Sequence, residues 1–102
     1  MQLTFWGVRG SSPQSGPDYQ YYGGHTSCTS LRVGKDLVVF DAGSGLLNLS
    51  TSLERDTNLP QDIYLFITHA HLDHIIGLSG FSWLWKTNTP FNLHLISAYR
   101  MN

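Results

Sequence analysis

The run Ile63-Tyr64-Leu65-Phe66-Ile67-Thr68, followed at once by His69-Ala70-His71-Leu72-Asp73-His74, decides how this chain folds. An uninterrupted apolar stretch leads into six residues that carry three imidazoles and a carboxylate. Such a cluster adds nothing to an apolar core, because His and Asp require partners or water. Imidazole nitrogen and carboxylate oxygen are the usual ligands of Zn²⁺, and the same mixed set suits Mn²⁺ or Fe²⁺. The segment therefore predicts a metal site at the end of a buried strand.

The spacing of the cluster supports this interpretation. If residues 63–68 form a strand, His69 and His71 point the same way and converge on one ion at its C-terminal end. A turn into a short helix, with Asp73 at its N-cap, would aim Asp73 and His74 at a second ion. Two ions roughly 3.5–4 Å apart clamp and hydrolyse phosphate esters. The predicted metal ligands are His69, His71, Asp73 and His74, with Asp73 also the predicted catalytic residue that orients the attacking water.

The rest of the chain reads as strands broken by glycine-rich turns. Strands are expected at residues 3–6, 30–33, 37–40 and 91–96, with a hairpin turn at Gly34 and a loop over residues 7–24. An amphipathic helix is expected over residues 46–54, with Leu46, Leu47, Leu49 and Leu53 in the core. The central strand is apolar everywhere except at Thr68, so we expect both of its faces to be covered and the sheet to carry helices.

Two further groups near the motif have open interpretations. Asp41 ends the run 37–40 beside the turn Ala42-Gly43-Ser44-Gly45. It is either a group that holds the metal loop in place or an ordinary turn aspartate. Phe81 and Trp83 follow the motif and are expected to be buried, with stacking on a base or leaving group as the alternative.

Several of these segments resemble the metallo-β-lactamase superfamily. His-x-His-x-Asp-His after an apolar strand is similar to its signature, and residues 40–45 resemble the turn before its first helix. Residues 7–13 and 22–28 resemble the opening of the branch that contains ribonuclease Z and related phosphodiesterases, although His25 stands where that branch has Asn. The resemblance runs from about Gln2 to about Ile96.

The resemblance implies a fold and an activity. The fold would be α/β (α+β): residues 1–102 as a single partial domain, the N-terminal half of an αββα sandwich with a mixed sheet and outer helices, truncated at its C-terminus. The activity would be metal-dependent hydrolysis, most simply of phosphodiesters by a metal-bound hydroxide on two Zn²⁺ ions. A further His, a bridging Asp and a final His complete such sites downstream, and His25 and His94 are the only other imidazoles here.

Two alternatives and a set of partners remain open at this stage. The chain could be an inactive fragment that at most binds metal or a partner, or a thioesterase or lactonase on the same fold. A homodimer or a complementing chain could supply the missing ligands to a small-molecule or nucleotide phosphoester site. The net charge of -1 and pI near 6.5 do not support a nucleic-acid partner.

Composition also bears on location. Cys28 is the single cysteine, so no internal disulfide is expected and a reducing compartment is the simplest setting. No signal peptide is visible, and no apolar run approaches the about 20 residues that span a bilayer. We therefore expect a cytoplasmic protein without a membrane partner.

Overall fold

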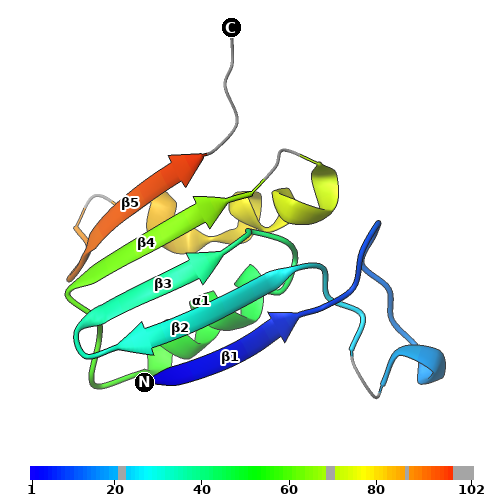
Figure 1. Cartoon of the computed structure of the whole chain (residues 1–102), viewed down its shortest axis with the longest axis horizontal. Helices are drawn as coiled ribbons and strands as arrows, with labels where there is room; N and C mark the ends of the chain where they lie inside the picture. Colours follow the sequence, from blue (N-terminus) through cyan, green and yellow to red (C-terminus); the bar gives the residue numbers. More distant parts are fainter. Residues whose placement is uncertain (21–22, 69–70, 87, 98–102) are drawn as a thin grey trace, which may run out of the picture.

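Five strands form one mixed sheet in the order β1-β2-β3-β4-β5 (Figure 1). The structure is a computed structural model that describes residues 1–20, 23–68, 71–86 and 88–97. The strands are β1 (Gln2–Gly7), β2 (Cys28–Val33), β3 (Asp36–Phe40), β4 (Asp62–Ile67) and β5 (Asn92–Ser97). The pairs β1–β2 and β2–β3 are antiparallel, whereas β3–β4 and β4–β5 are parallel. The mixed sheet and every predicted strand are thus confirmed.

The hairpin between β2 and β3 forms at the predicted position. Gly34 has a φ of 58°, a left-handed conformation that glycine adopts without steric cost. The tight turn leaves Val33 paired with Asp36 and Leu31 with Val38. This register sets the side chains of β2 and β3 on matching faces of the sheet.

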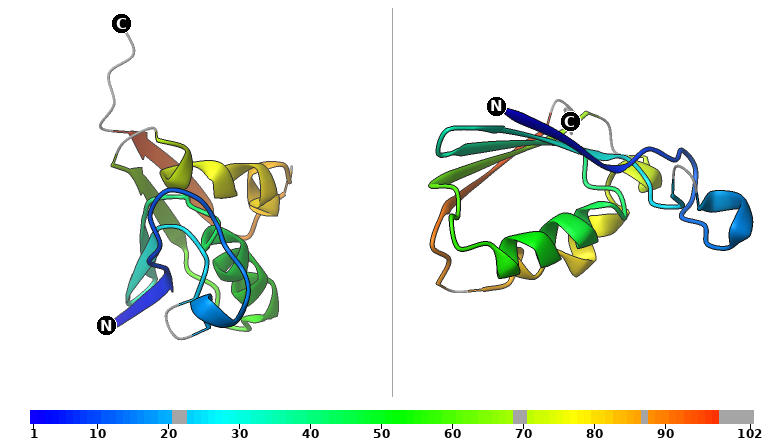
Figure 2. Two further views of the ribbon diagram at one scale, coloured as in Figure 1. Left: turned by 90° about the vertical axis from the view of Figure 1, so that its right-hand side faces the viewer. Right: turned by 90° about the horizontal axis from the view of Figure 1, so that it is seen from below.

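Helical segments cover one face of the sheet. The helix α1 (Leu46–Arg55) follows the glycine turn, and the short 3₁₀ segments η2 (Leu72–His74), η3 (Ile76–Gly80) and η4 (Ser82–Leu84) follow β4. A further segment, η1 (Pro17–Tyr19), lies in the loop after β1. Figure 2 shows α1 and the segments after β4 on the same side of the sheet. No helix in these described ranges is long and apolar enough to cross a membrane.

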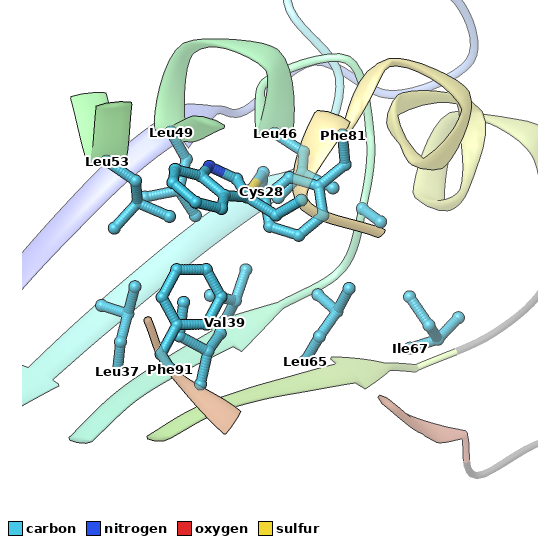
Figure 3. Packing of buried hydrophobic residues seen from close by; sticks show 13 residues of the cluster. Cys28, Leu37, Val39, Leu46, Leu49, Leu53, Leu65, Ile67, Phe81 and Phe91 are labelled. Carbon is cyan, nitrogen blue, oxygen red and sulfur yellow. The ribbon is translucent and has the colours of Figure 1, made fainter. Parts of the chain in front are cut away.

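The core lies between α1 and the sheet face below it (Figure 3). Burial alternates along β4, where Ile63, Leu65 and Ile67 are buried, as the period of two requires. From the helix side the core receives Leu46, Leu49, Leu53, Phe81 and Trp83, and Phe91, the residue before β5, joins it. The expected burial of Phe81 and Trp83 is confirmed.

The prediction that Leu47 belongs to the core face of the helix is wrong. It is 39% exposed, because one residue of helix turns it about 100° away from Leu46 and the core. Its side chain instead lies against Gly80, where an added Cβ would stand 2.2 Å from Leu47 Cδ2. The apolar face of α1 is therefore narrower than the leucine count suggested.

Both faces of β4 were expected to be covered, and the described residues cover one of them. Tyr64 and Phe66 point to the second face, over which none of the described elements packs (Figure 2). Apolar residues continue on that face in other strands, where Phe5 of β1 is 66% and Phe40 of β3 is 41% exposed. The apolar run in β4 shows that neither face of the strand carries charged side chains after Asp62. It does not show which face another element covers.

Candidate metal centre

The candidate site lies at the carboxyl ends of the parallel strands β3 and β4. Asp41 directly follows β3, and Thr68 directly follows β4 at the start of the histidine motif. A hydrogen bond of 2.7 Å from Asp41 N to Phe66 O joins the two ends. The carboxyl ends of parallel strands in open α/β sheets are where ligands bind.

Asp41 is the centre of the contacts that fix the motif. Its φ of 69° is left-handed, a conformation that Asp tolerates better than most residues. Its carboxylate accepts hydrogen bonds from Thr68 N at 2.8 Å and from Thr68 Oγ1 at 2.8 and 2.9 Å. The other contact is with His74, whose Nδ1 lies 3.0 Å from Asp41 Oδ2. Asp41 is thus a turn residue that contacts both Thr68 and His74, and its role toward a metal ion stays a prediction.

His74 lies between two carboxylates. Its Nδ1 faces Asp41, and its Nε2 lies 3.3 Å from Asp73 Oδ2. Donors about 2.0–2.2 Å from one tetrahedral ion are separated by roughly 3.3–3.6 Å, so the Asp73 and His74 atoms have a spacing that fits two ligands of a single divalent cation. A carboxylate on the other nitrogen of a ligating His is the usual support for such a ligand.

Asp73 does not occupy the predicted N-cap. The segment η2 begins at Leu72, and the N-cap position falls on His71. Asp73 lies inside the 3₁₀ turn, and its Oδ2 accepts a hydrogen bond of 3.2 Å from Ser11 N in the loop after β1. The chain is therefore tighter here than the predicted α-helical turn, and the carboxylate is held by a distant segment.

The remaining predicted ligands are less defined. His71 is exposed at the start of η2, and its carbonyl accepts a hydrogen bond of 2.9 Å from His74 N. His69 lies outside the described residues. Within the part of the chain that the structure describes, no three His, Cys, Asp or Glu side chains are grouped to hold an ion. The convergence of all four motif residues on metal therefore stays a prediction.

The glycine turn packs directly under the motif. Ala42 N donates to His74 O at 2.8 Å, and Gly77 N donates to Ala42 O at 2.7 Å. An added Cβ on Gly43 would lie 2.5 Å from Asp73 O and 2.5 Å from Thr26 Oγ1. This close approach explains why a glycine is needed between Asp41 and α1.

Sequence reasoning missed three hydroxyl or amide partners of the site. Ser11 lies in the stretch 7–13 that carries part of the family resemblance, but no role was predicted for it, and Thr68 stood out only as the one polar residue of its run. Ser44 Oγ accepts a hydrogen bond from Thr26 N at 2.9 Å and lies 3.1 Å from His25 Nδ1. His25 thus joins the glycine turn to the segment before β2.

Two other groups lie apart from the motif. His94 is in β5, where its Nε2 is 3.1 Å from Asp62 Oδ1 and its ring stacks on Tyr64 at 4.7 Å. Burial, with a smaller contribution from the Asp41 carboxylate, raises the pKa of the Cys28 thiol to about 12. A thiol that stays neutral is neither a metal ligand nor a nucleophile at ordinary pH.

Comparison with known proteins defines the class. The model of the Metallo-beta-lactamase superfamily matches residues 21–90, and the chain belongs to that family. Within it, the chain is similar to ribonuclease Z proteins. It is 28% identical over 92 residues to the ribonuclease Z of Haloarcula marismortui. The aligned region covers 86% of this chain and 25% of that relative.

A solved structure shows the same fold. The crystal structure of the short form of human tRNase Z superposes with a TM-score of 0.58 at 22% identity, covering 97% of this chain and 47% of that protein. The chain thus spans between about a quarter and about a half of the length of these two relatives. The predicted superfamily, the branch and the fold class are confirmed.

Proposed function

We propose that this chain carries the principal metal-binding motif of a metal-dependent phosphodiester hydrolase. The predicted ligands are His69, His71, Asp73 and His74, with a pair of Zn²⁺ ions as the first candidates and Mn²⁺ or Fe²⁺ as alternatives. The observation that carries the proposal is the position of His74, which lies 3.0 Å from Asp41 and 3.3 Å from Asp73.

Each residue has a distinct task in this proposal. Asp41 holds Nδ1 of His74, which leaves Nε2 directed toward Asp73 and the cation. Asp73 contributes charge to the cation and accepts a hydrogen bond from the attacking water. When bound, the ions would bring the pKa of that water toward neutrality and offset charge on the phosphate oxygens. Because the Thr68 and Ser11 contacts hold Asp41 and Asp73, the loop is organised in advance of substrate binding.

The substrate proposed is a phosphoester, with RNA first because both relatives named above are RNA-processing proteins by title. A nucleotide or another small phosphodiester is the alternative that the net charge of -1 favours. Two hydrolytic ions need about three protein ligands each, or a bridging carboxylate, so the four motif residues need further ligands besides themselves. A free, buried Cys28 is compatible with a cytoplasmic setting.

Metal binding to matched histidine variants tests the ligand assignment. We expect His71→Ala to weaken zinc or manganese retention by at least about tenfold, whereas His94→Ala, in β5, changes it little. Calorimetric titration of the folded protein measures both. Equal losses in the two variants, or no binding heat with either metal, would show that the motif is not the metal site.

Turnover assays separate the functional classes. Metal-dependent cleavage of bis(p-nitrophenyl) phosphate, without cleavage of a thioester, is the result expected of a phosphodiesterase. The reverse preference would identify a thioesterase. Metal binding without turnover of either compound would identify the chain as a binding fragment and would contradict the proposed hydrolysis by this chain.

A further inference from the structure

The carboxyl ends of three strands meet at the edge of the sheet that carries the candidate metal centre. Because β1 is antiparallel to β2 and β2 is antiparallel to β3, β1 runs in the same direction as β3 and β4. Figure 1 shows the arrowheads of these three strands at the same edge. The segment that follows β1, residues 8–20, is called here the β1 loop. It begins at the edge where Asp41 follows β3 and Thr68 follows β4.

The β1 loop is fixed to the motif by a strained turn. Ser11 N donates a hydrogen bond of 3.2 Å to Asp73 Oδ2. Ser12 N donates to Gly10 O at 3.1 Å, which closes a three-residue turn around Ser11, whose φ is 77°. Turns of this hand are rare and strained, and such residues persist where the surrounding structure holds them, often at ligand sites. The loop is therefore part of the wall of the candidate site.

Arg9 presents a guanidinium group from this loop. Its Nε donates a hydrogen bond of 2.8 Å to Ser12 O, and its Cζ lies 4.8 Å from the centre of the Tyr19 ring. Among the described residues no carboxylate forms an ion pair with Arg9. The ring and the carbonyl hold the group in place while its two Nη atoms keep their donors. A guanidinium fixed in this way is suited to bind a phosphate through two parallel hydrogen bonds.

Position distinguishes Arg9 from the other cationic side chains that the structure describes. The carboxylates of Asp41 and Asp73 lie at the same edge of the sheet, so an anionic substrate needs positive charge there beyond that of any bound ion. Arg9 supplies it beside Asp73. The other described cations lie at the opposite end of the sheet or beside a carboxylate: Arg32, Lys35, Arg55 and Lys86.

We propose that Arg9 binds a phosphate that flanks the scissile one in an RNA strand. Two residues of chain span at most about 7 Å, so the contacts of Ser11 and Ser12 place Arg9 Nε no more than roughly 13 Å from Asp73 Oδ2. That reach fits the next phosphates of a strand better than the reacting phosphate itself, and it favours an oligonucleotide over a small phosphodiester. The inference rests on the proposed function, from which it takes the substrate.

Amide NMR of the isotope-labelled chain, titrated with tetrauridylate over a salt series in the presence of a chelator, tests this subsite. Arg9→Gln should weaken binding by at least about fivefold and lower the salt slope by about 0.7, because one phosphate contact of a single strand is lost. Arg9→Lys keeps the charge and should restore the slope, but not the full affinity. The matched control is Arg55→Gln, in the last turn of α1 at the opposite end of the sheet, which should leave binding unchanged.

Three results would overturn the proposal: no binding by the unmodified chain at low salt, equal binding by Arg9→Gln, or equal binding of the uncharged methylphosphonate analogue of tetrauridylate. The amide spectrum of each variant shows whether it is folded. Tyr19→Leu, which removes the ring beside the guanidinium, is a second variant that should weaken binding in the same direction. Because the chelator removes bound ions, these outcomes are separate from the metal titration of His71→Ala, so either proposal can fail while the other stands.

Discussion

The variants Asp41→Gly and Asp41→Ala remove the same carboxylate. They differ in the free-energy cost of keeping the left-handed backbone conformation at this position. Asp41 is 6% exposed and has a φ of 69°. Glycine adopts this conformation freely, whereas alanine pays about 1–2 kcal/mol for its Cβ. The pair of variants therefore separates what the carboxylate contributes from what the backbone conformation costs.

The magnitudes follow from the contacts of the carboxylate. Hydrogen bonds to a charged group contribute about 1.5–3 kcal/mol, and Asp41 accepts from both the amide and the hydroxyl of Thr68. Part of this gain is offset by the desolvation of a buried carboxylate, so we expect Asp41→Gly to lower the free energy of unfolding by about 2–3 kcal/mol. Asp41→Ala should lower it by about 3–5 kcal/mol, because the left-handed strain is added.

Metal affinity should respond differently from stability. Both variants release Nδ1 of His74, which lies 3.0 Å from Asp41, so both should weaken zinc binding by about 10–100-fold and to the same extent. Urea denaturation measures the stability, and competition with a chromophoric chelator measures the affinity. We therefore expect the two variants to lose zinc affinity equally and to lose different amounts of stability.

Asp56→Ala is the matched control. Asp56 is an exposed turn carboxylate after α1 that accepts one backbone hydrogen bond of 2.8 Å from Asn58 N. Its removal should cost about 0.5–1.5 kcal/mol and leave zinc affinity unchanged. Equal stability of the glycine and alanine variants would refute the backbone argument. Unchanged affinity in Asp41→Gly would refute the role of Asp41 in orienting His74.

Three smaller predictions concern other parts of the chain. Gly43→Ala should lower the free energy of unfolding by about 1–3 kcal/mol, because the new Cβ meets backbone that cannot move aside; unchanged denaturation would contradict this packing. Native Cys28, with a pKa of about 12, should resist iodoacetamide at pH 8 and react quickly in denaturant; rapid native labelling would show that the thiol is accessible. His94→Ala should raise the lowered pKa of Asp62 toward its ordinary value in a carboxyl NMR titration, since the hydrogen bond from His94 is the main cause of the lowering and that from Asn92 the second. The His94–Asp62 contact favours folding above the ordinary Asp pKa and loses this effect as the pH falls through the lowered pKa, so an acid transition identical in both proteins would contradict it.

The prediction of secondary structure succeeded where a local pattern has a local cause. Alternating apolar residues, the glycine of the hairpin and the leucines of α1 each constrain a few neighbouring residues, and those elements formed as expected. Leu47 was assigned to the core wrongly, because apolar character records a preference for burial and does not show which surface is available to bury it.

The sequence by itself determined the strands, the helix, the superfamily and the spacing of the histidine motif. Only the tertiary structure decided that Asp41 contacts both Thr68 and His74, that Ser11 holds Asp73, and that the helical segments lie on one face of the sheet. These contacts join segments far apart in the chain, and their partners are selected by how the strands pair and how the loops pack. A short motif can specify the type of its ligands, but the groups that orient them are brought in by the fold.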